Sequence, residues 1–384
     1  MDETTSTDDT AGGTAGSRGD AAGVGGDAAA VGGDAAAVGG DAAAVGTSED
    51  TTGTLDEALE RLHTAGPERN GWLSNHGPMA VEALVRHGQA PLVHRWLDHY
   101  SDKLEDMPDA ASRVTAENWR EALGDPRRIA DWTLYFERET AERPWRDVLA
   151  EWWPRLLPGI AAGATHPVIR VGHSVRTLLA GEASAPRITE LAHGLGYWAA
   201  RHQPLPALTP LTPAPSAGAA LDAVPPVPEQ SGGIRDRLAR LTAFPVWPQR
   251  FTDDPDEART RLEELVRAAT HRYATHGHGE PVMLVHAATA PNAVLRTLPA
   301  LPRALWAPSL GAAWAASAAV TAAYGPAEPA PYAPTTASAE ELFARAAAHG
   351  DDHTIKFTDT ALDVGDSTAL AAALRSIELN PPTL

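Results

Sequence analysis

Residues 54–62 read Thr-Leu-Asp-Glu-Ala-Leu-Glu-Arg-Leu, and this stretch shows the pattern that decides the fold. Its three leucines, Leu55, Leu59 and Leu62, are spaced so that they share one face of an α-helix. The hydroxyl of the threonine in front of them can cap the first helical turn. The stretch therefore predicts an amphipathic helix that begins next to Thr54.

The same spacing of apolar residues continues along most of the chain, whereas the alternation typical of β-strands is scarce. Several segments start at or next to a proline, which suits the first turn of a helix. The predicted fold class is mainly α, as one large multi-helix domain or as two helical lobes. Further helices are predicted at residues 78–88, 91–103, 118–123, 126–142, 144–156, 166–179, 185–202, 234–242, 255–276, 282–298, 302–324, 338–349, 352–362 and 368–377.

Two segments interrupt the helical pattern and define the expected domain organisation. Residues 1–53 form an acidic tail of low complexity, in which the unit Gly-Gly-Asp-Ala-Ala-Ala-Val recurs. One valine per seven residues cannot form a continuous apolar seam, so this tail is expected to be disordered. Residues 203–233 are rich in proline and nearly free of charge, as is typical of a linker. The predicted lobes are residues 54–202 and 234–384.

Composition excludes several classes of protein and site. The 384 residues contain no cysteine, which rules out disulfides, thiolate nucleophiles and iron–sulfur clusters and fits a cytoplasmic location. The formal net charge is -19 and no basic stripe is present, so a nucleic-acid partner is not expected. The acidic N-terminus does not resemble a signal peptide, and no apolar run reaches the length of a membrane span. A soluble protein away from membranes is expected, and the sequence indicates no oligomeric state.

Common cofactor and nucleophile motifs are missing or out of context. The nearest match to a dinucleotide-binding fingerprint, residues 194–199 (GLGYWA), lies inside a predicted helix with no strand before it. The stretch 172–176 (GHSVR) lacks the second glycine of a nucleophile elbow. Neither lysine follows a glycine, so no phosphate-binding loop is present. A bound flavin or a classical NADPH domain is therefore not indicated.

Lysine is unusually rare in this chain: of 31 basic residues, only Lys103 and Lys356 are lysines. In an alanine-, glycine- and proline-rich sequence that favours arginine, a retained lysine is a candidate for chemistry that a guanidinium cannot perform. Lys103 lies in a short polar segment and is interpreted as a chance survivor. A neutral, buried Lys356 can act as a base, form an imine, or take up CO2 to become a carbamate, which is a good oxygen ligand for a metal.

The fifteen histidines fall into two groups. Nine stand in polar surroundings, where a surface position is favoured. Each of the other six could be a hydrogen-bonded core histidine, but several together with one singular lysine favour a metal site. Imidazole suits iron, zinc, copper or nickel. His353 lies three residues before Lys356, so the two share a helical face. The six are His76, His166, His173, His193, His286 and His353.

At these residues the chain resembles the questin oxidase-like family. The resemblance extends over residues 54–365. Fungal members differ from this chain at residues 170–173: they have His-Leu-Gly-Tyr, whereas this chain has Arg-Val-Gly-His. His173 is therefore interpreted as a bacterial-type feature that supports the site. The matching stretches are residues 74–79 (SNHGPM), 166–173 (HPVIRVGH), 190–198 (ELAHGLGYW), 286–289 (HAAT) and 351–356 (DDHTIK).

The resemblance implies a mainly helical oxidoreductase with a buried metal site, which uses O2 to open a ring of an anthraquinone-like or other phenolic polyketide by C–C cleavage. It implies Fe(II) as the cofactor, held by four histidines and a lysine that carries a CO2-derived carbamate. The implied partners are a small aromatic substrate and O2. Carried onto this chain, the ligands are His76, His166, His286, His353 and Lys356, and the further catalytic residues are His173 and His193 beside Lys356.

Two alternatives stay open at the level of sequence. One is a metal-free oxidase that uses NADPH in a Baeyer–Villiger-type reaction, and the other is a helical binding protein without catalysis. For a flat aromatic substrate, four tryptophans are possible walls, although core packing is the commoner role of each. They are Trp72, Trp198, Trp306 and Trp314.

Overall fold

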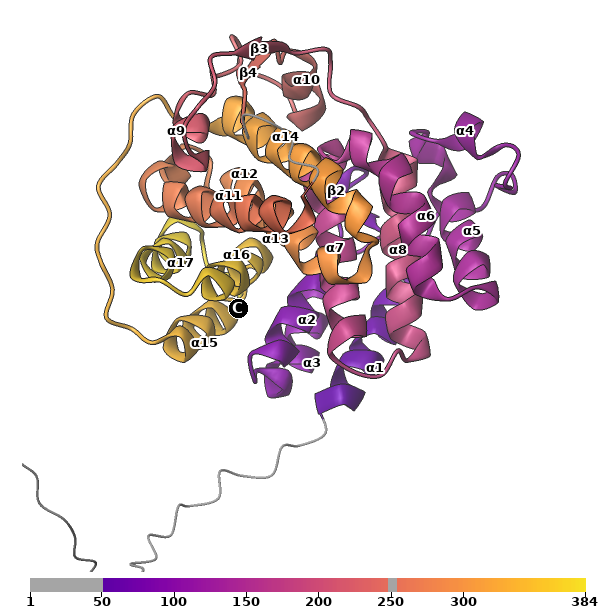
Figure 1. Cartoon of the computed structure of the whole chain (residues 1–384). Helices are drawn as coiled ribbons and strands as arrows, with labels where there is room; N and C mark the ends of the chain where they lie inside the picture. Colours follow the sequence, from indigo (N-terminus) through magenta and orange to yellow (C-terminus); the bar gives the residue numbers. More distant parts are fainter. Residues whose placement is uncertain (1–50, 248–253) are drawn as a thin grey trace, which may run out of the picture. The chain divides into compact units, whose positions relative to one another are not determined.

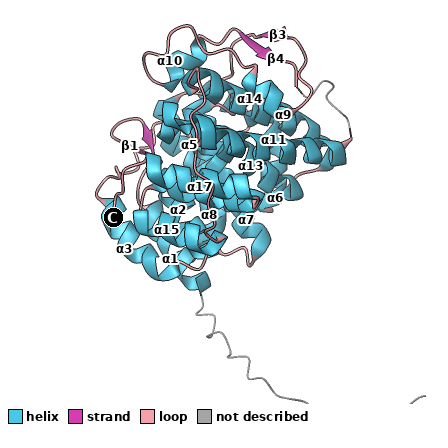
Figure 2. Cartoon of the chain, turned by 90° about the vertical axis from the view of Figure 1, so that its left-hand side faces the viewer, coloured by secondary structure: helices cyan, strands magenta, loops and turns pink. Residues whose placement is uncertain are grey.

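Helices account for nearly all the regular structure of the described residues, 51–247 and 254–384, so the mainly α prediction is confirmed (Figures 1 and 2). In this computed structural model the described residues all belong to one unit. The expected disordered tail lies outside the described residues except for residues 51–53, which open the first helix. That helix begins at Thr51, so the prediction that Thr54 caps it is wrong.

The N-terminal half of the unit contains eight α-helices and one small hairpin. The two strands of the hairpin pair antiparallel and lie directly before the second helix. The elements are α1 (Thr51–His63), β1 (Glu68–Arg69), β2 (Leu73–Ser74), α2 (Gly77–Arg86), α3 (Val93–Ser101), α4 (Trp119–Ala122), α5 (Ile129–Glu142), α6 (Trp145–Leu156), α7 (His166–Ala180) and α8 (Ala185–Arg201).

The C-terminal half continues in the same way and has a parallel pair of three-residue strands. Residues 203–233, the expected linker, contain one of these strands and a short helix. The elements are β3 (Thr209–Leu211), α9 (Ala217–Asp222), α10 (Ile234–Ala239), β4 (Ala243–Pro245), α11 (Pro255–His276), α12 (Pro281–Leu284), α13 (His286–Thr297), α14 (Trp306–Tyr324), α15 (Ala339–His349), α16 (Asp352–Val364) and α17 (Ser367–Leu379).

One predicted helix is divided in the structure. The segment 282–298 is two helices, α12 and α13, separated at Val285. The backbone carbonyl of Met283 accepts a hydrogen bond from the ring of His286. This break places His286 at the first position of α13 instead of in the middle of a longer helix.

Glycines let the central helices approach closely. A Cβ atom on Gly172 of α7 would lie 2.5 Å from the Cβ of Ala293 on α13, and one on Gly196 of α8 would lie 3.0 Å from the backbone of Thr133 on α5. The glycines at 194 and 196 are therefore part of helix packing inside α8, as the sequence indicated when it placed them in a helix. The core around these contacts is apolar and rich in buried tryptophan.

None of the helices in the described residues is both long enough and apolar enough to cross a membrane.

Candidate metal centre

Four of the six singled-out histidines stand at the N-terminal ends of four different helices. His76 immediately precedes α2, and His166 and His286 are the first residues of α7 and α13. His353 is the second residue of α16. Two of these helices come from the expected lobe 54–202 and two from the lobe 234–384, so the cluster joins distant parts of the chain.

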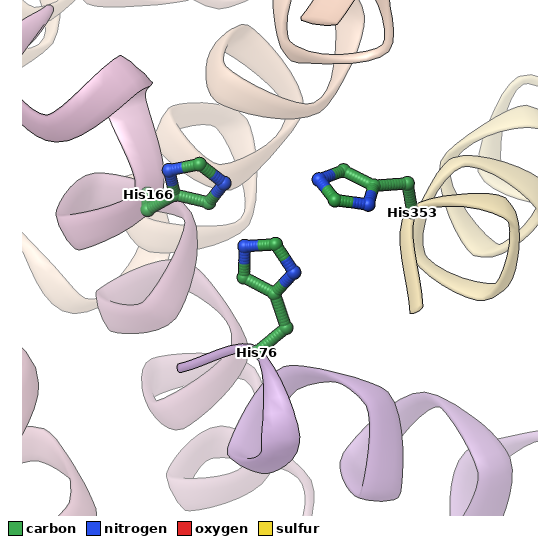
Figure 3. A group of neighbouring side chains, drawn as sticks. All are labelled: His76, His166 and His353. Carbon is green, nitrogen blue, oxygen red and sulfur yellow. The ribbon is translucent and has the colours of Figure 1, made fainter. Parts of the chain in front are cut away.

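The four imidazole rings pack against one another. Ring centroids are 4.4 Å apart for His76 and His166, 4.4 Å for His76 and His353, and 4.3 Å for His166 and His286. All four side chains are buried. Figure 3 shows His76, His166 and His353 with their rings turned toward a common centre, and nitrogens of these three lie within 4.8 Å of one another.

In each of the four rings the Nδ1 nitrogen faces a hydrogen-bond acceptor, which keeps the ring hydrogen on that nitrogen. The Nδ1 atoms of His166 and His286 donate to the carbonyls of Gly163 and Met283, at 2.6 and 2.9 Å. The Nδ1 atoms of the other two rings face one carboxylate oxygen of Asp352. A carbonyl or carboxylate can only accept, so each Nδ1 carries the hydrogen. In a neutral ring this leaves the lone pair on Nε2.

The four Nε2 atoms are the ones left for a ligand. Those of His76 and His353 are buried and have no hydrogen-bond partner among the described residues. Those of His166 and His286 face each other at 2.8 Å. Two nitrogens bound to one ion at about 2.1 Å and at right angles lie about 3 Å apart. The arrangement of the inner nitrogens fits a shared metal ion.

Burial keeps the rings of His76, His166 and His286 neutral near pH 7. Desolvation lowers the pKa of His76 to about 3, against the opposing charge of Asp352. Burial and the neighbouring rings and lysine hold the pKa values of His166 and His286 well below their usual range. Burial alone would raise the pKa of Asp352, but its contacts with the rings of His76 and His353 outweigh that effect and lower it. These three neutral imidazoles thus lie in one cluster with an ionised carboxylate.

Lys356 lies one turn after His353 and is 1 % exposed. Its Nζ has no hydrogen-bond partner among the described residues. Burial lowers its pKa to about 8, although Asp352 and Asp351 oppose the shift. Because its pKa is lowered, part of this buried amine is neutral near pH 7, and that fraction has a lone pair for covalent chemistry or coordination.

Comparison with known families bears on this cluster. The model of the questin oxidase-like family matches residues 73–360, about three quarters of the chain. The chain belongs to the questin oxidase-like family. The matched range contains the four clustered histidines and Lys356, and membership makes this questin oxidase-like protein an oxidoreductase of that family. No curated protein matches the chain.

The turn before α7 holds a clustered histidine of this questin oxidase-like protein in an uncommon conformation. Gly163, Ala164 and Thr165 have φ values of 53°, 54° and 67°. A β-branched residue such as threonine rarely adopts this left-handed region, which costs on the order of 1–3 kcal/mol. The turn points the carbonyl of Gly163 back at the Nδ1 of His166. Backbone strain here coincides with the fixing of the His166 ring.

The structure places His173 and His193, the two other predicted site residues, in separate polar clusters. The Nδ1 of His173 lies 2.7 Å from a carboxylate oxygen of Glu82, and the Nε2 of His193 lies 3.0 Å from one of Glu137. The ring of His193 lies 4.7 Å from that of His63. Among the described residues, neither His173 nor His193 is in ring contact with any of the four clustered histidines.

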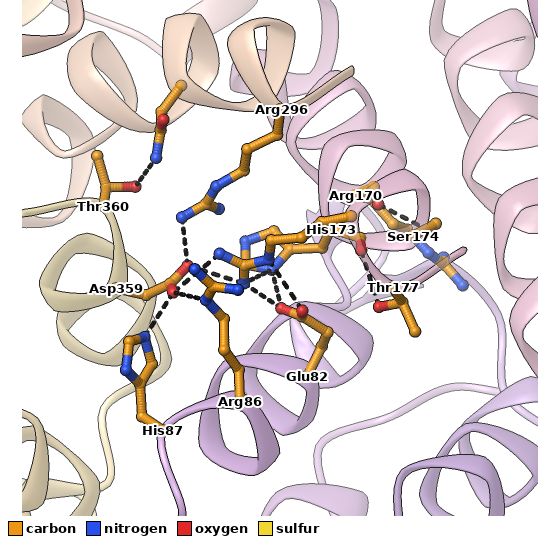
Figure 4. A network of polar contacts seen from close by, with 12 residues as sticks. Glu82, Arg86, His87, Arg170, His173, Ser174, Thr177, Arg296, Asp359 and Thr360 are labelled. Carbon is orange, nitrogen blue, oxygen red and sulfur yellow. Dashed lines mark hydrogen bonds and ion pairs between the residues drawn. The ribbon is translucent and has the colours of Figure 1, made fainter. Parts of the chain in front are cut away.

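A buried ion network ties together the same four helices that carry the clustered histidines (Figure 4). Arg176 of α7 binds Glu82 of α2 and, at 3.0 Å, Asp359 of α16. Arg296 of α13 donates to Asp359 at 2.7 Å. The Asp359 side chain is fully buried. Because these links lie further along each helix than the histidines, the network fixes the spacing of the four helix ends.

Sequence reasoning missed two residues that contact the clustered histidines. Asp352 holds two of the rings, and the hydroxyl of Tyr100 accepts a hydrogen bond from the backbone nitrogen of His76 at 2.7 Å. Asp352 could have been suspected, because it stands directly before His353. Nothing in the sequence marks Tyr100 in the same way, because its position fits the helical spacing of ordinary core residues.

The four tryptophans considered as walls differ in position. Trp198, Trp306 and Trp314 are buried in the main core. Trp72, at the tip of the β1–β2 hairpin, is 62 % exposed. Only the hairpin tryptophan of this group is open to a ligand from solvent.

Proposed function

We propose that this questin oxidase-like protein is a nonheme-iron oxygenase that uses O2 to cleave a C–C bond in a ring of a phenolic, anthraquinone-like substrate. The observation that supports it best is the orientation of the four rings. Each Nδ1 is held by an acceptor, and each Nε2 is directed inward. Proteins build this pattern to present imidazole lone pairs to a metal.

Bound there, Fe(II) would supply the activation of O2 that organic side chains cannot provide. The ligands would be the Nε2 atoms of the four clustered histidines and an oxygen on modified Lys356. Asp352 keeps the rings of His76 and His353 oriented and would add one negative charge next to a bound ion. Burial of all these groups excludes bulk water from the reacting atoms.

Lys356 would contribute as a carbamate. Its neutral Nζ attacks the carbon of CO2 and forms an N–C bond. The nitrogen then loses one proton to solvent, leaving a carbamate with one negative charge that brings the centre from +2 to +1. The positive ends of four helix dipoles point into the cluster, and they favour an anion at this position. Arginine, whose nitrogens stay protonated, cannot follow the same route.

Metal analysis of the purified full-length protein tests the proposal. We expect about one equivalent of iron in the wild type and below about a tenth of an equivalent after His76→Ala, His166→Ala or His286→Ala. His99→Ala, at an exposed histidine of α3, is the matched control and should keep the iron. Far-ultraviolet circular dichroism verifies that each variant is folded. Wild-type protein with under a tenth of an equivalent of any transition metal, and histidine variants without effect, would refute the metal centre.

Two other functions make different predictions in the same assays. A metal-free NADPH-dependent oxidase would consume NADPH in step with substrate, whatever the metal content. A helical binding protein without catalysis would keep its metal content and ligand binding after Lys356→Arg. The inward Nε2 atoms and the unpaired Lys356 favour the iron-dependent oxygenase over both.

A further inference from the structure

The hairpin that leads into His76 has an exposed aromatic side chain at its tip. Strands β1 and β2 are joined by the loop 70–72. Asn70 and Gly71 have φ values of 50° and 76°, which suit a tight hairpin turn. Trp72 follows them and, at 62 % exposure, is the one exposed tryptophan among the described residues. It lies four residues before the proposed ligand His76.

Polar contacts at both ends hold this hairpin in place. The carboxylate of Glu68 accepts a hydrogen bond from the hydroxyl of Tyr197 at 3.2 Å and pairs with Arg201, both on α8. At the tip, the backbone nitrogen of Gly71 donates to Glu105 at 3.0 Å. These contacts anchor the backbone of the hairpin that carries Trp72.

Two cations near the ring of Tyr100, one of them on strand β1, have no counter-ion among the described residues. The guanidinium of Arg69 and the ammonium of Lys103 lie 5.8 and 5.7 Å from the centre of the Tyr100 ring. Neither side chain forms an ion pair or a hydrogen bond with the described residues, and the Nε of Arg69 is buried without a partner. In contrast, the buried Arg170 forms a two-pronged pair with Glu190.

The unpaired cations stand close to the proposed metal centre. They share the ring of Tyr100, whose hydroxyl accepts the hydrogen bond from the backbone of His76. One tyrosine ring therefore separates the two cations from the ligand cluster. Positive groups gathered beside a metal site repel one another unless an anion comes between them.

We propose that Arg69, Lys103 and Trp72 form a subsite for the anionic edge of a flat aromatic substrate. The guanidinium and the ammonium bind the carboxylate or phenolate oxygen through charge-assisted hydrogen bonds, and the indole covers the ring face. The subsite selects an acidic aromatic compound and turns its ring toward the cluster. This inference rests on the proposed function and names the substrate class more closely.

The test is equilibrium binding of two ligands of equal shape to the iron-loaded full chain without O2. Anthraquinone-2-carboxylate carries the negative charge, and 2-(hydroxymethyl)anthraquinone is neutral. We expect the wild type to bind the carboxylate about tenfold more tightly than the neutral compound. Arg69→Gln and Lys103→Gln should each remove most of this preference, and Arg69→Lys should keep part of it. Trp72→Ala should weaken both ligands by a similar factor of about three to ten.

Arg95→Gln is the matched control, because Arg95 is an exposed arginine on the neighbouring helix α3. Its preference for the carboxylate should equal that of the wild type. The subsite would be overturned if the wild type bound the charged and the neutral compound equally well. It would also be overturned if the preference for the carboxylate were the same in Arg69→Gln, Lys103→Gln and Arg95→Gln. Iron content is measured on the same samples and should not change. A wild-type chain that binds no metal but retains the preference would contradict the proposed function and support the subsite.

Discussion

Lys356 shows how strongly one residue's chemistry depends on what surrounds it. Its rarity drew attention in the sequence, but rarity applies equally to Lys103. The two lysines lie in different settings: the first is 1 % exposed in a cluster of imidazoles, and the second lies partly exposed over a tyrosine ring. Burial lowers the pKa of the Lys356 amine, which raises the neutral fraction that carbamate formation requires near neutral pH.

A labelling experiment follows from this difference. In protein equilibrated with 13C-labelled bicarbonate, we expect a carbamate carbon signal in the wild type that disappears in Lys356→Arg. Lys103→Arg removes the only other lysine and should retain the signal. A carbamate signal that survives in Lys356→Arg would contradict the proposal. Iron content and O2 consumption should fall together with the signal, because the lost ligand also supplied negative charge.

At the scale of helices, the cluster depends on how closely α7 and α13 approach. Their first residues, His166 and His286, meet at 2.8 Å, and Gly172 touches Ala293 further along the same pair. A side chain at residue 172 would force these helices apart, since the nearest atoms include backbone that cannot yield. The separation of the two Nε2 atoms is therefore set partly by a glycine two turns away.

Gly172→Ala tests this dependence. We expect a loss of about 1–3 kcal/mol in the free energy of unfolding, measured by urea denaturation, together with weaker iron binding. Gly218→Ala is the control, because Gly218 lies in helix α9 and a Cβ there would have no atom within 4 Å. That variant should be unchanged or slightly more stable. Unaltered iron affinity in Gly172→Ala would show that the cluster tolerates a wider helix spacing.

The helical periodicity of apolar residues predicts most of the helices. It indicates on which face of a helix a side chain lies, but not how far that side chain is from a site. His173 shares a helix with His166, yet seven residues of rise separate the two by about 10 Å along the axis. It therefore contacts Glu82 and Arg176 instead of the cluster. Periodicity also predicts one longer helix around His286, whereas in the structure α12 ends at Leu284 and α13 begins at His286, a division that apolar spacing does not indicate.

At the scale of the whole molecule, buried charges hold the four central helices together and make stability depend on pH. Burial would raise the pKa of Glu82, but Arg176 and His173 outweigh it and lower that pKa from 4.5 to about 2. A carboxylate whose pKa is lower in the folded protein stabilises it above the unfolded-state value. Its contribution is lost as the pH falls from about 4.5 to about 2.

The pH dependence of unfolding measures this contribution. A shift of that size corresponds to about 3 kcal/mol, which the wild type should lose progressively as the pH falls across that interval. Glu82→Gln should be less stable at pH 7 and should lose less stability on acidification. Asp256→Asn is the control, since this exposed aspartate pairs with Arg303 at the surface and should change the profile little. Parallel wild-type and Glu82→Gln profiles would contradict the assignment.

The assembly of the cluster from four helices between residues 76 and 353 has a consequence for the order of events in the cell. His353 and Lys356 lie near the C-terminal end of the sequence, so the complete set of proposed ligands exists only after a growing polypeptide has been made past residue 356. Under the proposed function, iron would enter this complete set, and its affinity would add to the stability of the finished fold. Delivery of the metal would then be a step separate from synthesis and later than it.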